Sequence, residues 1–214
     1  MAAAAAPSPP APRETPERIL EAALEVFSQQ GFDGARTRDI ASQAGVRLGL
    51  LQYHFGSKED LWRAAVTRAF DDLEEGFERD LAASTADSPR ERLRALIRGH
   101  AYFVAKNTAF IRIMHDEGKR PGPRMQWLAD RYVEPLYRRV TPTIIEAQAC
   151  GVLVQEIDPA HFVYTLLGAV GMFFHQAEEC KRVTGLNPTD PATIDAHIRV
   201  VESLFLGDTN EETS

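Results

Sequence analysis

The sequence contains little that would point to an exported or membrane-embedded protein. It has only two cysteines in 214 residues, too few for the disulfide framework of a small secreted domain. No apolar run approaches the roughly 18–20 residues of a membrane-spanning helix. The N-terminal stretch MAAAAAPSPPAP lacks the basic start and apolar centre of a signal peptide, and its Ala, Pro and Ser bias predicts a disordered leader. We therefore expect a cytoplasmic protein with reduced thiols and no membrane partner.

Enzyme and cofactor motifs are also missing. The sequence contains no G-x-S-x-G motif, no Walker phosphate loop and no glycine-rich dinucleotide fingerprint. Residues 115–117 (His-Asp-Glu) and 175–180 hold potential metal ligands, but neither spacing is diagnostic and solvated polar helix faces explain both. We predict no enzyme activity, no cofactor and no metal site.

Basic residues are too few to give the chain a positive charge, and they are unevenly placed. The formal net charge is −7. Residues 13–58 carry six basic and six acidic residues, so all of the net negative charge lies in residues 59–214. Within the neutral part, residues 33–58 carry four basic and two acidic residues. This distribution predicts a weakly positive edge that can bind phosphates, on an acidic body.

The most informative stretch runs from Arg36 to Leu61. Its centre, Ala44-Gly45-Val46, reads as a tight turn between two short helices, because Gly45 can adopt the positive φ that ends a helix. Each helix has an apolar face, at Ile40, Ala41 and Ala44 in the first and at Leu51 and Phe55 in the second. The pattern predicts a helix-turn-helix, whose second helix can enter the major groove of DNA.

The same stretch carries a family resemblance. Residues 37–61 read T-x-x-I-A-x-x-A-G-V-x-x-G-x-L-x-Y-H-F-x-x-K-x-x-L, which resembles the DNA-binding domain of the TetR family of bacterial transcriptional regulators. The match covers about residues 15–61, and beyond it only the size and the helical pattern fit. Two positions depart from the family pattern: the family usually has Tyr at the position of Gln52, and often a small residue at that of Leu50. Both lie on the expected reading face, so they bear on which operator is read.

The reading face is expected to include the start of each helix of the motif. Thr37 is the predicted N-cap of the second helix, where the amide end can bind a phosphate, and Arg38 can reach a base or a phosphate. Gly49 is costly in a helix, and either close backbone approach to DNA or tight packing explains it. The resemblance implies phosphate contacts by Tyr53, His54 and Lys58. The predicted DNA-binding residues are Thr37, Arg38, Arg47, Leu48, Gly49, Leu50, Gln52, Tyr53, His54 and Lys58.

Start and stop signals along the chain predict an all-α protein of about nine helices. Capping residues are expected at Thr15, Ser57, Ser88, Asp158 and Asp190. A long seventh helix over about 124–149 contains Pro135 and Pro142, which should kink or break it. The eighth helix is apolar nearly all round up to residue 178. We expect a leader (1–12), a DNA-binding domain with the helix-turn-helix (13–58), a helical ligand-binding and dimerisation domain (59–207) and a flexible tail (208–214).

The last two predicted helices have more apolar surface than one chain is expected to cover. The resemblance implies that they pair with their copies, giving a homodimer with two reading heads about 34–36 Å apart on a palindromic operator. The alternative is that these helices only form the core. The residues predicted to form the dimer interface are Phe162, Leu166, Val170, Phe173, Phe174, Ile198, Val201 and Phe205.

The middle helices are rich in aromatic residues. A mostly apolar cavity with a few polar tips is typical of small-molecule sites, although such a stripe is more often plain core. The resemblance implies an effector pocket, and the predicted lining residues are Phe103, Phe110, Met114, His115, Trp127, Tyr132 and Tyr137. The leading hypothesis is a repressor that a small apolar or aromatic ligand releases from DNA. The alternatives are an activator of the same fold, or a ligand-binding or enzymatic body with a vestigial DNA-binding head.

Overall fold

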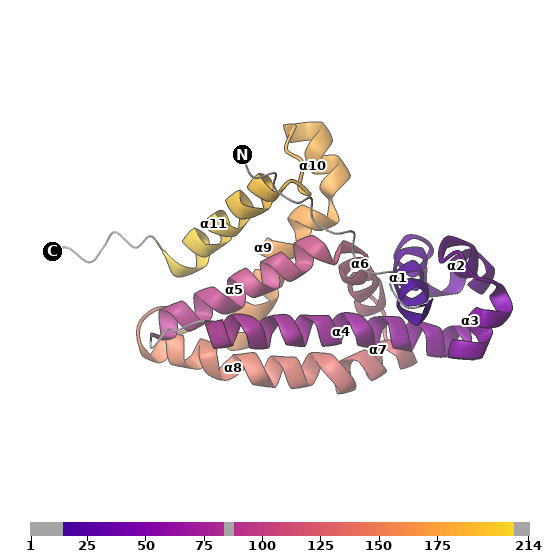
Figure 1. Ribbon diagram of the computed structural model, residues 1–214. Coiled ribbons are helices and arrows are strands. Elements are labelled where there is room, and N and C mark those ends of the chain that lie inside the picture. Colours follow the sequence, from indigo (N-terminus) through magenta and orange to yellow (C-terminus); the bar gives the residue numbers. More distant parts are fainter. Residues whose placement is uncertain (1–14, 84–87, 208–214) are drawn as a thin grey trace, which may run out of the picture. The chain divides into compact units, whose positions relative to one another are not determined.

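The structure, a computed structural model, describes residues 15–83 and 88–207. Within these ranges all regular structure is helical, so the all-α prediction is confirmed (Figure 1). The predicted leader and tail, residues 1–12 and 208–214, lie outside the described residues. The chain divides into two compact units, Met1–Val66 and Thr67–Ser214. The predicted boundary after residue 58 falls earlier, at the first turn of the helix that spans this division.

The first unit is built from three helices, which short loops connect, and the beginning of a fourth. These are α1 (Thr15–Gly34), α2 (Thr37–Gln43), α3 (Leu48–Phe55) and α4 (Lys58–Ala83). α1 packs against α2 and α3, and α2 against α3. Their apolar faces form one core, which the first turns of α4 complete. Its largest fully buried side chains are Ile19, Phe27, Ile40, Leu51, Leu61 and Trp62.

The turn between α2 and α3 has the geometry that the sequence predicts. Gly45 has φ +66°, which only glycine adopts at little cost. The amide of Val46 donates to the carbonyl of Ala41 at 2.9 Å, and that of Gly45 donates to Ser42 at 3.1 Å. This pair of bonds is a Schellman motif, which satisfies the last carbonyls of a helix and redirects the chain. It fixes the angle at which α3 leaves α2.

Two residues predicted as N-caps in this unit, Thr15 and Thr37, lie instead inside their helices α1 and α2. Arg36, not Thr37, is the N-cap of α2, and no side chain caps this helix end. Thr37 is therefore the first helical residue. By contrast, Ser57 caps α4 as predicted, because its Oγ accepts from the amide of Asp60 at 3.0 Å. Gly31 has φ +67° inside α1, so regular α1 ends there.

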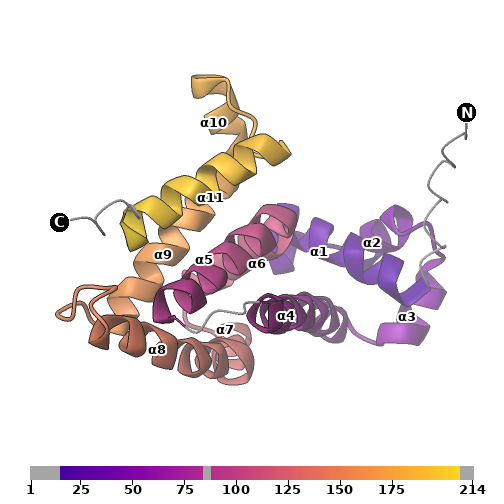
Figure 2. The same ribbon diagram turned by 60° about the vertical axis from the view of Figure 1, so that its left-hand side comes forward.

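The second unit contains the rest of α4 and all later helices. α11 packs along α5 and α9, and α8 packs on α5 and α9 (Figures 1 and 2). The core between them holds Leu93, Ile97, Val104, Ile144, Phe162, Val170, Phe174, Ile198 and Val201. The helices are α5 (Pro89–Lys106), α6 (Thr108–Gly118), α7 (Pro123–Leu128), the π-helical segment η1 (Ala129–Val133), α8 (Glu134–Ala149), α9 (Pro159–His175), α10 (Ala177–Thr184) and α11 (Pro191–Leu206).

Two predicted helices are divided in the structure. The predicted seventh helix is α7, η1 and α8. The π-helical segment ends two residues before Pro135, whose missing N–H disturbs the hydrogen-bond ladder. The helix continues through Pro142, which is exposed, so water can reach the carbonyl that it leaves unpaired. The predicted eighth helix breaks at Gln176 into α9 and α10.

Side-chain caps in the second unit agree with two of three predictions. Ser88 accepts from the amide of Glu91 at 3.2 Å, and Asp158 accepts from the amide of Ala160 at 2.7 Å. Asp190 is the N-cap residue of α11 as predicted, but its side chain makes no cap hydrogen bond. It accepts instead from the amide group of Asn187 at 2.8 Å.

Candidate functional site

The exposed face of α3 carries the side chains predicted to read DNA. Leu51 is buried in the core of the unit, so α3 turns its other face outward. Tyr53 is 83% exposed and Leu50 is 40% exposed, and Tyr53 packs edge-on against His54 with ring centroids 5.4 Å apart. Because these aromatic and leucine side chains are exposed, they do not stabilise the core and are available to contact a partner. The described exposed members of the predicted set are Arg38, Arg47, Gly49, Leu50, Gln52, Tyr53 and His54.

A surface hollow lies beside this face. It is lined by Arg36, Thr37, Arg38, Gln52, Gly56 and Lys58. The lining holds three cationic side chains and, among the described residues, no acidic one. Phosphate groups are the anions that such a hollow suits. Arg36 was not among the DNA-binding residues predicted from the sequence. Its position at the start of α2, next to Thr37 and Arg38, could have indicated it.

Lys58 also has partners inside the protein. Its Nζ donates to the carbonyl of Ala35 at 2.8 Å and to that of Asp33 at 3.3 Å. The same ammonium lies 4.6 Å from the ring centroid of Phe32, within cation–π range. A structural role therefore explains a lysine at the start of α4, where the helix dipole disfavours it. The predicted phosphate contact by Lys58 stays a prediction.

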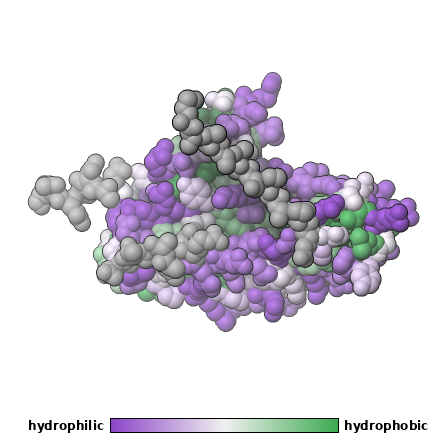
Figure 3. Space-filling view, viewed as in Figure 1, coloured by the Kyte–Doolittle hydropathy of each residue, from purple (hydrophilic) through white to green (hydrophobic). Residues whose placement is uncertain are grey.

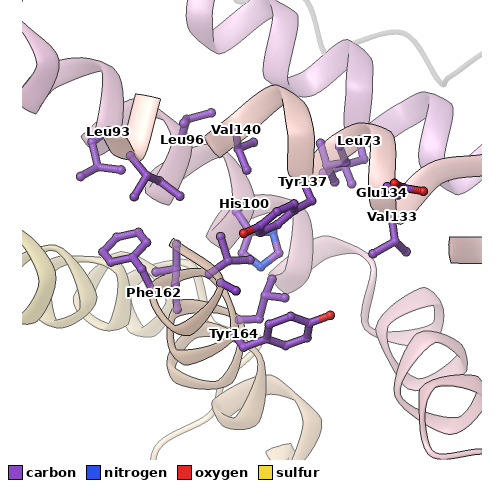
Figure 4. A pocket seen from close by; sticks show the side chains of 16 residues that line it. Leu73, Leu93, Leu96, His100, Val133, Glu134, Tyr137, Val140, Phe162 and Tyr164 are labelled. Atoms are coloured by element: carbon purple, nitrogen blue, oxygen red, sulfur yellow. The ribbon is translucent and has the colours of Figure 1, made fainter. Parts of the chain in front are cut away.

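The second unit contains a cavity of about 470 Å³ between α4, α5, α8 and α9, which is open to solvent on one side, where the exposed Tyr164 and Leu167 line it (Figure 4). This volume is in the range of small-molecule sites. Aliphatic side chains make up most of the lining, and the polar groups are few. The lining residues are Leu73, Leu93, Leu96, His100, Val133, Glu134, Leu136, Tyr137, Val140, Ile144, Ala160, Phe162, Val163, Tyr164, Leu166 and Leu167.

His100 is the most unusual member of this lining. Figure 4 shows its ring on α5, pointing into the cavity. The ring keeps some accessible surface because it faces the cavity, yet burial lowers its pKa from 6.5 to about 4. His100 is therefore neutral at pH 7, with one donor and one acceptor nitrogen.

Of the seven residues predicted to line a ligand site, only Tyr137 lines this cavity. Phe103, Phe110 and Tyr132 pack instead in a buried aromatic cluster around Phe70, whose ring lies 4.2 Å from that of Tyr132 and 4.9 Å from that of Phe110. Trp127 packs edge-on against Tyr132 at 5.4 Å. Sequence spacing could not separate these core aromatics from cavity residues, because both lie on inward helix faces.

Met114 and His115 lie on α6, and neither lines the cavity. The ring of His115 lies 4.8 Å from that of His175. Burial, followed by the neighbouring His175, lowers the pKa of His115. Nδ1 of His175 is buried without a hydrogen-bond partner in the described part of the chain. The described residues contain no group of three or more His, Cys, Asp or Glu side chains that could hold a metal ion.

The predicted dimer residues divide into two groups. Five are buried within one chain and form its core: Phe162, Val170, Phe174, Ile198 and Val201. The other three, Leu166, Phe173 and Phe205, are half-buried and pack against that core. Phe162 and Leu166 also line the cavity. The prediction from apolar residues therefore selected the inward faces of α9 and α11, where such residues are densest.

The outward faces of the same helices carry a second apolar set. On α9 the exposed apolar side chains are Tyr164, Leu167 and Met172, of which Tyr164 and Leu167 also line the cavity. On α11 they are Val200 and Leu204, which are 55% and 74% exposed. The face seen in Figure 3 is mostly hydrophilic and is interrupted by limited hydrophobic patches. We define Leu167, Met172, Val200 and Leu204 as the α9–α11 surface. Among the described helices, none has the length and apolar character needed to cross a membrane.

Comparisons with known proteins agree with this arrangement. The family model for bacterial regulatory proteins of the tetR family matches residues 19–65. A second model, for the tetracyclin repressor-like C-terminal domain, matches residues 89–204. Among curated relatives, the HTH-type transcriptional repressor KstR2 of Mycobacterium tuberculosis is 35% identical over 115 residues, which are 53% of this chain and 56% of that protein. The match thus spans little more than half of that relative's length.

Solved structures share the fold. AibR in complex with isovaleryl coenzyme A and operator DNA has a TM-score of 0.72 and 21% identity, over 91% of this chain and 99% of that one. The fatty acid degradation regulator FadR from Bacillus halodurans has a TM-score of 0.68 and 19% identity, over 93% and 98%. At these identities the likeness concerns the fold alone. The two matching family models together cover both units, and the chain therefore belongs to the TetR family of bacterial regulatory proteins.

Proposed function

We propose that the protein is a homodimeric transcriptional repressor that binds a palindromic operator and is released from it by a small ligand. The observation that carries the proposal is the outward face of α3, where Leu50, Tyr53 and His54 are exposed beside a hollow lined by Arg36 and Arg38. Exposed side chains on a recognition helix supply base contacts, and adjacent cations supply phosphate contacts. KstR2, one of the matching relatives, is named a transcriptional repressor. In this role the chain is a regulator and not an enzyme, and it acts in the cytoplasm.

The dimer would form through the α9–α11 surface. Its four side chains are exposed on two helices that pack side by side within one chain. Covering them with the same surface of a second copy removes apolar area from water and gives a closed, two-fold pair. Two reading heads on one dimer would recognise two half-sites about one DNA turn apart.

Ligand release would use the cavity in the second unit. α4 connects the two units covalently: its Leu61 is buried in the core of the first, and its Leu73 lines the cavity of the second. A ligand that displaces Leu73 can therefore favour one arrangement of the reading heads over another. AibR, with which the chain shares its fold, was solved with both a ligand and operator DNA.

Selection of bound duplexes from a random pool tests the proposal. With the purified chain, we expect enrichment of one inverted repeat, and binding to it that weakens as salt is raised. The enriched duplex then serves to screen ligands for release of the protein. Salt-sensitive binding without any enriched sequence would contradict a sequence-specific regulator. An enriched single half-site bound by a monomer would contradict the dimer alone.

A further inference from the structure

The lining of the cavity lacks a partner for an anion. Among its described residues no lysine or arginine is present, and the single acidic residue is Glu134. Glu134 accepts a hydrogen bond of 2.5 Å from Arg138, one helical turn further along the exposed side of α8. An ionised group placed beside His100, at the depth where burial lowers the pKa of that imidazole, would lose its hydration without gaining a counter-charge. Such burial costs several kcal/mol, on the order of 2–7 even for an uncharged polar group without partners.

The cavity does offer a neutral hydrogen-bonding group. His100 has no hydrogen bond to any residue in the described part of the chain, although its ring is deep enough for burial to lower its pKa to about 4. It lies among aliphatic side chains, with Leu96 one turn before it on α5 and Val140 on α8. Figure 4 shows His100 and Tyr137 directed into the same space. A neutral imidazole that faces an apolar cavity without a hydrogen-bond partner from the described residues favours a ligand that brings its own polar atom.

The composition of the lining also limits the carbon skeleton of the ligand. Leucine, valine, isoleucine and alanine side chains from four helices dominate, and the aromatic residues are Tyr137, Phe162 and Tyr164. Aliphatic walls suit a flexible or bulky aliphatic skeleton as well as an aromatic one, since their attraction for the ligand is dispersive and non-directional. Specificity therefore depends on the few polar groups.

We infer that the ligand held in this cavity is an uncharged aliphatic molecule, or the uncharged aliphatic part of a larger one, with a single oxygen that bonds to His100. A ketone or an alcohol fits this description, whereas the ionised carboxylate of the same skeleton does not. His100 is then a specificity-determining residue. The inference rests on the proposed function only in taking the cavity to be the effector site.

Four matched probes test the inference: 2-decanone, 1-decanol, decanoate and n-decane, titrated calorimetrically into the full chain at pH 7.5. We expect the ketone and the alcohol to bind at least about tenfold more tightly than decanoate, because the carboxylate is buried without a counter-charge. We expect them to bind about fivefold more tightly than decane, as one net hydrogen bond provides. Decanoate binding as tightly as the ketone would overturn the inference, and so would failure of all four probes to bind.

Two variants locate the effect. His100→Leu should still bind decane but should lose the advantage of ketone over alkane. Leu96→Lys, which places an ammonium one turn from His100, should raise the relative affinity for decanoate about tenfold or more. Thermal unfolding confirms that each variant folds, and unchanged ligand preferences in both folded variants would overturn the assignment. Binding of the selected duplex in the absence of ligand is measured in parallel, so that a failure of the proposed regulator is distinguished from a failure of the ligand inference.

Discussion

The guanidinium of Arg18 on α1 donates a hydrogen bond of 2.6 Å to the carbonyl of Ala44, the C-cap of α2. The same Nη2 lies where a side chain at the next residue would go, since a Cβ on Gly45 would meet it at 3.0 Å. One cation on α1 thus satisfies a helix-end carbonyl and fills the space that glycine leaves. The helix-turn-helix is therefore held by a residue that lies outside its own sequence.

Replacing these two residues should destabilise the first unit in a coupled way. Gly45→Ala should lower the free energy of unfolding by roughly 1–2 kcal/mol, because alanine is strained at positive φ. Arg18→Ala should cost about 1 kcal/mol through the lost cap bond. The double variant should lose less free energy of unfolding than the sum of the losses in the two single variants, because the new Cβ no longer meets the Arg18 side chain. Denaturant unfolding of the four proteins measures this, and strict additivity would contradict the contact.

Arg38 should contribute to DNA binding and not to folding. Arg38→Ala should weaken binding of the selected duplex by about 1–3 kcal/mol if it contacts a base. If it contacts only a phosphate, binding should weaken for all sequences and the slope of affinity against salt should fall by about one. The matched control is Arg120→Ala, an exposed arginine of the second unit. Equal effects of both variants would contradict a specific role for Arg38.

Lys58 should contribute to stability through its bonds to the first unit. Lys58→Met keeps the apolar stem against Phe32 but leaves the carbonyl of Ala35 without its 2.8 Å donor. We expect a loss of about 1–3 kcal/mol in the free energy of unfolding. Fluorescence-monitored unfolding in urea measures it. DNA affinity, measured where both proteins are folded, then shows separately whether Lys58 also binds phosphate. An unchanged stability would mean that the lysine serves DNA binding alone.

Charges on the α9–α11 surface should prevent dimerisation. Leu204→Glu and Met172→Glu each place a carboxylate on an exposed apolar position, which would be buried next to its copy in a two-fold pair. We expect monomers by analytical ultracentrifugation and loss of binding to the palindrome, with folding retained. Val154→Glu is the control, since Val154 is 59% exposed but lies outside both helices. A dimer that survives both α9–α11 variants would place the interface elsewhere.

His100 should make stability depend on pH in acid. Above pH 6.5 the folded and unfolded chains both hold this imidazole neutral, so it contributes nothing to the pH dependence. As the pH falls from 6.5 to about 4, the unfolded chain takes up the proton first, and the free energy of unfolding decreases by up to about 3 kcal/mol. Burial also lowers the pKa of His115 and His197, which act in the same direction.

Comparison of variants isolates the contribution of His100. His100→Leu should flatten the decrease in stability between pH 6.5 and 4, measured as urea midpoints across that range. The control is His161→Leu, because His161 is exposed on α9 and does not line the cavity. A wild-type slope retained in His100→Leu would show that this imidazole is not buried in the neutral form.

Local signals in the sequence were sufficient to predict most helices and the helix-turn-helix. Gly45 permits the positive φ that ends α2 at little cost, and Ser57, Ser88 and Asp158 cap helices through bonds to residues two or three positions away. Such features depend on backbone geometry within one turn, so spacing alone predicts them. The outward set on α3 follows in the same way, because Leu51 and the polar-tipped residues around it fall on opposite sides of one short helix.

Which residues line the cavity of the second unit, and which form the α9–α11 surface, depended on tertiary structure. An inward-facing side chain has the same periodicity whether it meets another side chain, as Phe110 meets Phe70, or an open cavity, as His100 does. Likewise α9 is apolar on most faces, and only the packing of α11 and α5 decides that Val170 is buried while Met172 is exposed. The sequence by itself thus determined the all-helical fold, the helix-turn-helix and the family. Which apolar residues face a ligand, a partner or the core was decided by packing between helices distant in the chain.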